Sequence, residues 1–203
     1  MAGRAKGALW YTVFLAGALP FLGLVGVASF GSLGADPAKT LTHQTGTWAM
    51  NFLLLCLAMS PFSTYLKMPK LVSYRRQLGL WCYFYVCLHF LVFLALLIEF
   101  NPANMAKELV ERPYITVGFG GFLLLTIMAI TSIPRLIRAM GARRWRRLHK
   151  VVFAVVVLAC IHFIWLSRSS LLEATVYSLL FGVLIGMRLY YYRERLQRQA
   201  ATA

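Results

Sequence analysis

The chain has 203 residues, of which 60% are hydrophobic and only 13% are charged. Soluble globular domains average about 45–50% apolar and about 25% charged residues, so this composition excludes a soluble domain. So many apolar residues also exclude a disordered chain. The net charge is nevertheless +15, from 21 Lys and Arg against 6 Asp and Glu. Such a basic excess suits either nucleic acid or an anionic membrane surface, and the positions of the charges decide between the two.

Six segments are apolar enough to cross a bilayer, which takes roughly 20 residues of helix. In chain order they are residues 9–30, 48–66, 78–100, 114–134, 151–166 and 171–192. The fifth is short unless it is extended back to residue 148. Arg4 and Lys6 precede the first segment, but its apolar run exceeds the roughly 7–15 residues of a secretory signal, so we interpret it as a retained helix. The sequence predicts an all-α polytopic membrane protein, a six-transmembrane-helix bundle that forms one domain over residues 1–203.

The basic residues alternate between the two sides of these segments. Seventeen of the 21 lie on the side that carries both termini: Arg4, Lys6, Lys67, Lys70, Arg75, Arg76, Arg135, Arg138, Arg143, Arg144, Arg146, Arg147, Lys150, Arg188, Arg193, Arg195 and Arg198. The other side has Lys39, Lys107, Arg112 and Arg168. Because short cytoplasmic loops carry the excess of Lys and Arg, we expect both termini in the cytoplasm. The alternation also argues against nucleic acid as a partner, since the basic residues line no soluble face.

The four cysteines all fall inside the predicted spans: Cys56, Cys82, Cys87 and Cys160. A quinone-linked disulfide oxidase needs thiols in the loops that face the oxidising side, so that class is excluded. No Cys-x-x-Cys-His segment occurs, which excludes covalently attached haem. We interpret the cysteines as small buried apolar side chains.

Two histidines, His89 and His162, lie well inside predicted spans, where an ionisable side chain is costly and points to function. Imidazole is a common iron ligand, and a flat apolar porphyrin packs between membrane helices. Counted along the helices, His89 is about 17 Å from the start of its span, near mid-bilayer, and His162 is about 20 Å beyond His149. We therefore expect His89 and His162 to hold one haem b from opposite sides. A packing role through hydrogen bonds between helices is the structural alternative.

The other two histidines are weaker candidates. His149 opens the fifth span at its cytoplasmic end and suits a second haem, with a solvated interfacial histidine as the alternative. On an ideal helix it points roughly 140° away from His162, so the two share a face only if the helix carries a bulge or a frayed first turn. His43 lies outside the second span, where we expect a structural role first and iron ligation second. There Thr45 or Thr47 suits the N-cap of that span.

Four basic residues near the cytoplasmic ends of the spans suit haem propionates or a flavin phosphate: Arg75, Arg76, Arg147 and Lys150. The positive-inside rule explains them equally well. Neither a phosphate-binding loop nor a Gly-x-Gly-x-x-Gly after a strand occurs, so the sequence shows no nicotinamide-binding or flavoprotein domain.

Several short segments resemble the MsrQ (YedZ) family, in the family's order and over nearly the whole chain. They are residues 33–37 (Leu-Gly-Ala-Asp-Pro), 43–46 (His-Gln-Thr-Gly), 75–81 (Arg-Arg-Gln-Leu-Gly-Leu-Trp), 88–89 (Leu-His), 112–116 (Arg-Pro-Tyr-Ile-Thr), 131–132 (Thr-Ser), 145–149 (Trp-Arg-Arg-Leu-His) and 161–165 (Ile-His-Phe-Ile-Trp). Each segment is weak alone, but the set is specific. That family belongs to the ferric-reductase-like transmembrane superfamily.

The resemblance implies a haem-binding subunit of a methionine sulfoxide reductase system in the bacterial inner membrane. The family's haem ligands match His89, His149 and His162 here. The resemblance also implies electron transfer to a periplasmic molybdopterin subunit, MsrP, which reduces methionine sulfoxide in damaged envelope proteins. It further implies bound FMN, for which no residue here is matched, and a cytosolic flavin reductase or membrane quinol as electron donor.

We therefore predict a membrane cytochrome b with one or two haems, which carries electrons from the cytoplasmic face to a periplasmic reductase. The bilayer core is about 30 Å thick, so a single haem in its middle needs FMN or a second haem on the cytoplasmic side. The chain has no candidate site for reducing a sulfoxide, and we expect an electron-transfer subunit. One alternative is a cytochrome b561-like or ferric reductase that acts on a small outer substrate. Another, of a different class, is a colourless proton-coupled transporter with His89 and His162 as a relay.

Overall fold

The computed structural model describes residues 7–31, 33–167 and 171–201, with every side chain in these ranges except those of Arg195 and Ala201. Within them the chain is helical apart from short connections, and no strand occurs. Arg4, Lys6 and Arg168, which entered the charge analysis, lie outside these ranges.

Six spans in the described ranges are long and apolar enough to cross a membrane, which confirms the six-span prediction. Four of them lie on single α-helices: α1 (Ala8–Phe30), α2 (Pro37–Tyr65), α5 (Pro113–Ile130) and α9 (Leu171–Ala201). The third span joins the 3₁₀ turn η1 (Pro69–Tyr74) and α3 (Arg75–Leu96). The fifth joins α7 (Ala142–Leu148), the 3₁₀ turn η2 (His149–Val151) and α8 (Val152–Leu166). The connections hold two short helices, α4 (Pro102–Glu111) and α6 (Pro134–Met140).

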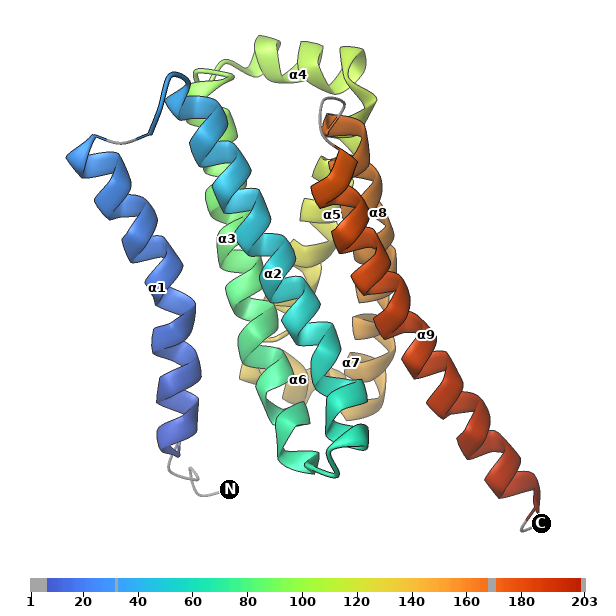
Figure 1. The fold of residues 1–203 in the computed structure, drawn as a ribbon. Coiled ribbons are helices and arrows are strands. Elements are labelled where there is room, and N and C mark those ends of the chain that lie inside the picture. The colour runs from blue at the N-terminus through green and yellow to red at the C-terminus, as the bar shows by residue number, and fades with distance from the viewer. Residues whose placement is uncertain (1–6, 32, 168–170, 202–203) are drawn as a thin grey trace.

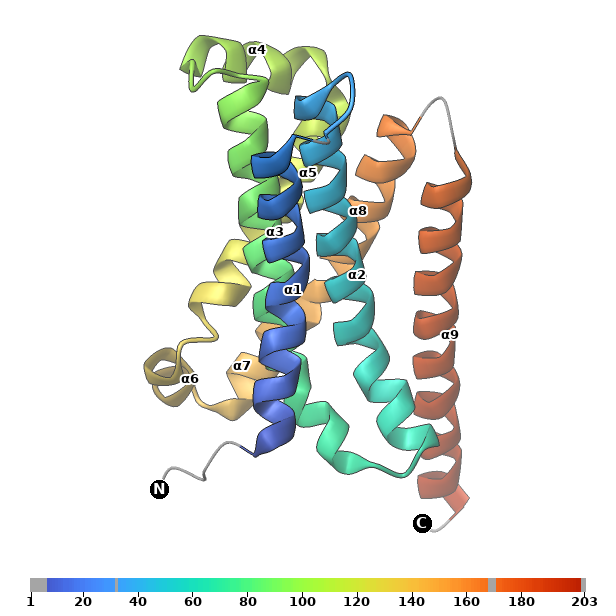
Figure 2. The same cartoon turned by 60° about the vertical axis from the view of Figure 1, so that its left-hand side comes forward.

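The spans pack as a bundle with α2, α3, α5 and α8 at its centre (Figure 1). α1 lies on one side against α3, and α9 lies on the other side against α2 and α8 (Figure 2). The most deeply buried side chains of the centre come from α2, α3 and α8: Leu53, Leu57, Cys82, Tyr85, Val155 and Val156.

The two ends of the bundle differ in structure and in charge. α4 lies across one end, which we call the α4 end (Figure 1). η1, α6 and α7 lie at the other end, together with the start of α1 and the end of α9. These elements and their connections carry Lys67, Lys70, Arg75, Arg76, Arg135, Arg138, Arg143, Arg144, Arg146, Arg147, Lys150, Arg193 and Arg198, so we call this the basic end.

α2 begins earlier than the hydropathy pattern predicts. Asp36 caps it, because the Asp36 carboxylate accepts a hydrogen bond from a backbone N–H in the first turn and Pro37 occupies the first helical position. The prediction that Thr45 or Thr47 caps this helix is therefore wrong. His43 accordingly lies inside α2 and not in a loop before it.

α3 ends earlier than predicted, at Leu96. Glu99 and Phe100 adopt left-handed backbone conformations with φ of 55° and 53°, which turn the chain towards α4. His89 is therefore about two turns from the α4 end of α3, closer to that end than the mid-bilayer depth predicted from the sequence.

Pro61 in α2 frees a backbone carbonyl that α9 contacts. It has no N–H to donate to the Leu57 carbonyl four residues earlier, and Arg188 of α9 donates to that carbonyl instead. Membrane helices tolerate an internal proline when a neighbour satisfies the freed carbonyl in this way. The Arg188 guanidinium also lies 5.5 Å from the centre of the Phe153 ring on α8.

Candidate functional site

His89 on α3 packs against the first turns of α2. Its Nδ1 atom lies 2.9 Å from the Thr42 carbonyl and 3.4 Å from the Thr45 hydroxyl. A carbonyl only accepts, so Nδ1 carries the ring proton and Nε2 is left with its lone pair. Gly46 permits this approach, since a Cβ added there would lie 3.2 Å from two atoms of the ring. Among the described residues, nothing forms a hydrogen bond with Nε2 of His89.

His162 on α8 has the same arrangement against the first turns of α5. Its Nδ1 atom lies 2.7 Å from the Tyr114 carbonyl, which again leaves the lone pair on Nε2. Gly118 lies under the ring so closely that an added Cβ would be 2.7 Å from Nδ1. Nε2 of His162 also has no hydrogen-bond partner in the part of the chain that the structure describes.

The structure brings these two rings together. The ring centres of His89 and His162 are 6.3 Å apart, and the ring planes are nearly perpendicular at 87°. One metal ion between two imidazoles needs about this separation, because each metal–nitrogen bond is about 2 Å and each ring centre lies roughly 1 Å further out. No group of three or more His, Cys, Asp or Glu that could hold a metal ion occurs in the described ranges. The pair therefore fits an iron whose other ligands come from a porphyrin, and does not fit a metal ion held by protein ligands alone.

His149 lies at the basic end, in the 3₁₀ turn before α8. Its Nδ1 atom lies 3.0 Å from the Trp145 carbonyl, and the ring stacks on the Trp145 indole with centres 3.9 Å apart. Its Nε2 atom lies 3.2 Å from the Ser132 hydroxyl, whose oxygen also lies 2.8 Å from the Met128 carbonyl. The one hydroxyl proton can be donated to either acceptor, so His149, unlike His89 and His162, has a contact at Nε2.

His43 differs from the other three histidines because, among the described residues, its Nδ1 atom forms no hydrogen bond with a backbone carbonyl. Its Nε2 atom lies 3.1 Å from the Glu173 carboxylate at the start of α9, and both side chains are nearly half exposed. The ring also lies beside Phe163, with centres 6.4 Å apart. The geometry favours a structural link between α2 and α9 at the α4 end and gives no support to iron ligation by His43.

The four basic residues predicted to hold propionates or a flavin phosphate lie on three elements at the basic end, namely α3, α7 and η2. Arg75 is partly buried at the start of α3, where its carbonyl accepts a hydrogen bond from the Cys56 thiol at 3.2 Å. Arg76, Arg147 and Lys150 are exposed on separate elements. None of the four forms an ion pair with a described carboxylate. Each therefore remains available to an anionic group at the basic end.

Sequence reasoning missed two glycines that shape the site and one arginine that takes part in the packing of the bundle. Gly46 and Gly118 fix how closely the two histidine rings approach the neighbouring helices, and the only signal for them is a glycine inside an apolar span. Arg188 was counted with the basic C-terminal tail, although it lies within the predicted sixth span. A cation inside an apolar segment was the signal for its role.

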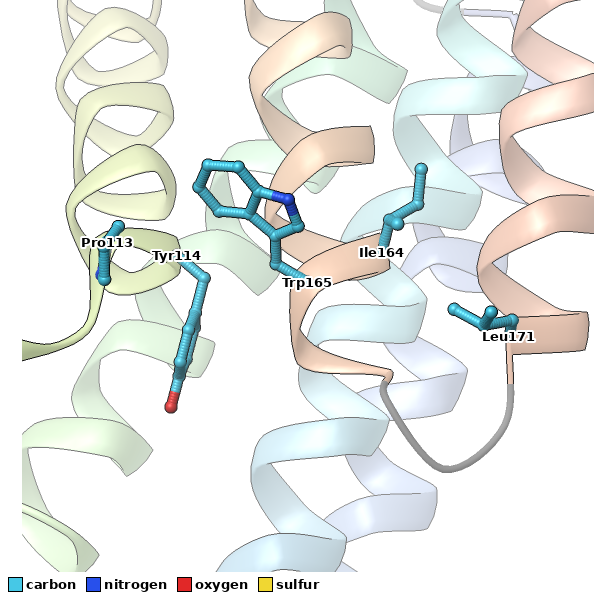
Figure 3. Close-up of a pocket in the computed structure, with 5 residues that line it drawn as sticks. All are labelled: Pro113, Tyr114, Ile164, Trp165 and Leu171. Carbon is cyan, nitrogen blue, oxygen red and sulfur yellow. The ribbon is translucent and has the colours of Figure 1, made fainter.

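A cavity of about 450 Å³ opens beside His162 at the α4 end. Figure 3 shows its lining: Pro113 and Tyr114 from α5, Ile164 and Trp165 from α8, and Leu171 from α9. Tyr114 connects the two features, because its carbonyl holds the His162 ring. The Trp165 side chain is about half exposed, so the cavity offers an aromatic surface close to the histidine pair.

Two comparisons with known proteins bear on this site. Residues 45–160 match the family of ferric reductase like transmembrane components, a range that includes His89 and His149. The chain is 37% identical over 99% of its length to the protein-methionine-sulfoxide reductase heme-binding subunit MsrQ of Polaromonas naphthalenivorans, of which it covers 94%. It is also 37% identical to MsrQ of Ralstonia nicotianae, over 93% of the chain and 88% of that protein.

Proposed function

The chain belongs to the MsrQ family of ferric-reductase-like transmembrane proteins, and from this premise we propose that it is a haem b protein that carries electrons across the membrane to a methionine sulfoxide reductase subunit. The observation that carries the proposal is the pair of rings from His89 and His162 at 6.3 Å. Each ring has its Nδ1 proton bound to a carbonyl and its Nε2 lone pair available, which is the state that an iron ligand requires.

The haem, when bound, supplies a one-electron carrier. The protein's part is to hold the two imidazoles in one tautomer. The carbonyls of Thr42 and Tyr114 accept the Nδ1 protons, which orients each ring and makes Nε2 more basic. Because both carbonyls come from helix starts and not from mobile side chains, the ligand geometry is set by the packing of α2 on α3 and of α5 on α8.

His149 supports a second haem nearer the basic end. Like the other two candidate ligands, it binds a carbonyl through Nδ1. It lies about 20 Å from His162 along η2 and α8, so a haem held by His149 would be a separate carrier nearer the basic end. We propose His149 as a ligand of that carrier, and we propose Arg75 as the nearest partly buried cation for its acid groups.

The distribution of basic residues gives the proposed direction of electron transfer. We propose that the basic end faces the cytoplasm in a bacterial inner membrane, with both termini inside, because Lys and Arg mark cytoplasmic loops. Electrons then enter at the basic end from a cytosolic flavin reductase or a membrane quinol, with FMN as a further carrier. They leave at the α4 end, beside the Trp165 cavity, to a periplasmic molybdopterin subunit of the MsrP type. That subunit reduces methionine sulfoxide in envelope proteins.

Haem spectroscopy tests the proposal. Purified after haem-sufficient expression, the protein should show a Soret band, and His89→Ala and His162→Ala should each abolish the low-spin spectrum of the pair. His43→Ala is the matched control, since it removes a histidine of the same end without touching the pair, and it should keep the spectrum. Pyridine haemochrome then counts haems per chain, and loss of one haem in His149→Ala would identify the second site. A colourless wild-type protein overturns the proposal in favour of a transporter.

A second measurement separates this function from the nearest alternative. The reduced protein should be reoxidised by an MsrP-type subunit with methionine sulfoxide present, and slowly by ferric chelates alone. Rapid reoxidation by ferric chelates without that subunit would favour a ferric reductase that acts on a small outer substrate.

A further inference from the structure

Arg188 is a cation inside the sixth span, and its side chain reaches from α9 to two neighbouring helices. One nitrogen of its guanidinium donates to the Leu57 carbonyl of α2, and the group lies 5.5 Å from the centre of the Phe153 ring on α8. Phe153 follows His149, the residue proposed to bind the second haem, by four residues. Arg188 therefore lies beside the first turn of α8 that follows this proposed iron ligand.

The Leu57 carbonyl uses only part of the hydrogen-bonding capacity of Arg188. A guanidinium has several N–H donors, and among the described residues this carbonyl is the only group that accepts from it. The Nε atom is buried without a partner, whereas Nη1, which also has none, is not buried. An acceptor from outside the chain can therefore reach Nη1 while the Leu57 bond holds the guanidinium in place.

Arg75 at the start of α3 brings a second cation to the same region. Its guanidinium is close enough to act electrostatically on both Arg188 and the His149 ring, and both guanidinium groups act on the Cys56 thiol. The Arg75 side chain is partly buried and forms no hydrogen bond or ion pair with a described residue. Two cations from α3 and α9 therefore converge near His149.

No protein carboxylate compensates for these two charges. The one acidic residue of the basic end is Glu194, and it pairs with Arg198 further along α9. Like charges inside a bundle repel each other more strongly than in water, and cations at membrane depth are normally paired. The arrangement is thus short of an anion, and guanidinium groups bind carboxylate or phosphate oxygens best, through charge-assisted hydrogen bonds.

Depth favours one source of this anion over the other. The Leu57 carbonyl, which fixes Arg188, lies eight residues before Tyr65 at the end of α2, or about 12 Å along the helix. Lipid phosphates lie in the headgroup region outside the hydrocarbon core. The propionates of a haem, by contrast, enter the bundle together with the iron that His149 is proposed to bind.

We propose that Arg188, together with Arg75, binds the carboxylates of the haem at His149. This inference rests on the proposed electron-transfer function and on its second haem. It gives α9 a part in the cofactor site, although that helix contributes none of the proposed iron ligands. Arg188 then has two roles, because one N–H group satisfies the α2 backbone and another holds the haem.

A substitution in α2 separates the two roles of Arg188. Pro61→Ala supplies an N–H for the Leu57 carbonyl, so the bond from Arg188 is dispensable in that background. In haem titrations of the haem-free protein, the binding phase that His149→Ala abolishes should be about tenfold weaker in Pro61→Ala/Arg188→Met than in Pro61→Ala. Arg188→Lys in the same background keeps the charge and should recover most of the affinity. Arg193→Met is the matched control, because it removes an exposed cation of α9 and should change nothing.

Haem dimethyl ester, in which both propionates are esterified, identifies the group that Arg188 binds. The same phase should be weak for the ester and equal with and without Arg188, because no carboxylate remains. If Arg188→Met weakens binding of haem and of its ester equally, the residue only supports packing and the proposal is overturned. Equal haem affinity with and without Arg188 overturns it as well. Loss of co-purified anionic lipid in that case, read by mass spectrometry, would identify a lipid phosphate as the anion.

Arg75→Met provides a test that does not depend on Pro61→Ala. Because the Arg75 side chain has no described hydrogen bond to lose, this variant should also bind haem about tenfold more weakly in that phase and the ester equally well. A wild-type protein that binds haem only at the His89–His162 pair would overturn this inference and leave the electron-transfer function standing. A wild-type protein that binds no haem would overturn both.

Discussion

Three of the four histidines present Nδ1 to a backbone carbonyl, and that choice determines what their other nitrogen can do. A neutral imidazole has one N–H, so binding a carbonyl at Nδ1 leaves the lone pair on Nε2. His89, His149 and His162 share this state, whereas His43 uses Nε2 to contact Glu173. The distinction separates candidate iron ligands from a structural histidine without reference to depth or helix face.

Gly118 should control haem binding, although it cannot ligate. A Cβ at this position would lie 2.7 Å from Nδ1 of His162, a contact that real structures avoid, so Gly118→Ala must push the ring away from the Tyr114 carbonyl. Disturbing a group that orients a metal ligand typically lowers metal affinity about tenfold or more. We expect a comparable loss of haem affinity, measured by haem titration of the purified protein.

Gly120→Ala is the matched control for that variant. It lies on the same helix, two residues away, and the nearest atom to an added Cβ is on Leu158 at 4.0 Å, an ordinary contact. Helix propensity changes equally in both variants, so equal haem affinity in Gly118→Ala and Gly120→Ala would contradict the steric argument.

At the scale of helices, proline and arginine act together. Pro61 frees the Leu57 carbonyl of α2, and Arg188 of α9 donates to it. The buried Nε atom of Arg188 has no partner, so the side chain satisfies the backbone at some cost to itself. The interaction therefore belongs to the pair of helices, and neither residue explains it alone.

A double-mutant cycle measures this coupling. In Pro61→Ala the new N–H can donate to the Leu57 carbonyl, so Arg188→Met should destabilise that variant less than it destabilises the wild type. We expect a difference of about 0.5–1.5 kcal/mol in the free energy of unfolding, the usual value of a net hydrogen bond. Unfolding of the four proteins by sodium dodecyl sulfate, followed by circular dichroism, gives the cycle.

The control cycle uses the other proline inside a span. Pro20 lies in α1, on the far side of the bundle from α9, so Pro20→Ala and Arg188→Met should be additive. A coupling as large in this cycle as in the Pro61 cycle would show that the effect is not the Leu57 hydrogen bond.

The spans were predictable and their contacts were not. Apolar runs of about 20 residues are longer than the apolar runs found in the connections between helices, so the hydropathy pattern alone predicted all six spans. It missed α4 and α6 because short helices at the membrane surface carry polar residues, and it placed the start of α2 too late because the first turns of that helix are polar. Those turns contain Thr42, whose backbone carbonyl accepts the hydrogen bond from His89. A hydropathy pattern reports side-chain polarity and therefore does not predict a contact made by the backbone.

Counting residues along the spans predicted that His89 and His162 lie close together, and the two rings do lie 6.3 Å apart. The same count did not predict the backbone carbonyls that orient the two rings. Two helices that run in the same direction bring residues of equal depth together, which is a property of the sequence. Whether a ring fits against its neighbour depends on Gly46 and Gly118, which lie on helices α2 and α5 and have no fixed spacing from either histidine. Such pairs across helices appear only when the packing is known.

At the scale of the whole molecule, the two ends of the bundle differ in the sign of their charged residues. Five of the six acidic residues lie at the α4 end or on its connections, namely Asp36, Glu99, Glu108, Glu111 and Glu173, whereas the basic end has only Glu194. His149 lies towards the basic end, and the His89–His162 pair lies towards the α4 end. A carrier of electrons from cytoplasm to periplasm needs this order of sites, so orientation in the membrane is the property on which the whole proposal depends.

Orientation can be read from the labelling of single introduced cysteines. Lys107→Cys on α4 and Arg143→Cys on α7 place thiols at exposed positions of opposite ends. Because the positive-inside rule puts the basic end in the cytoplasm, a membrane-impermeant maleimide should label Lys107→Cys in intact cells and Arg143→Cys only after permeabilisation. The parent protein is the control, since its four cysteines lie within spans and Cys82 is fully buried. Labelling of Arg143→Cys from outside would show that the basic end faces the periplasm. That result would contradict the proposed direction of electron transfer and the proposed side of the sulfoxide-reducing partner.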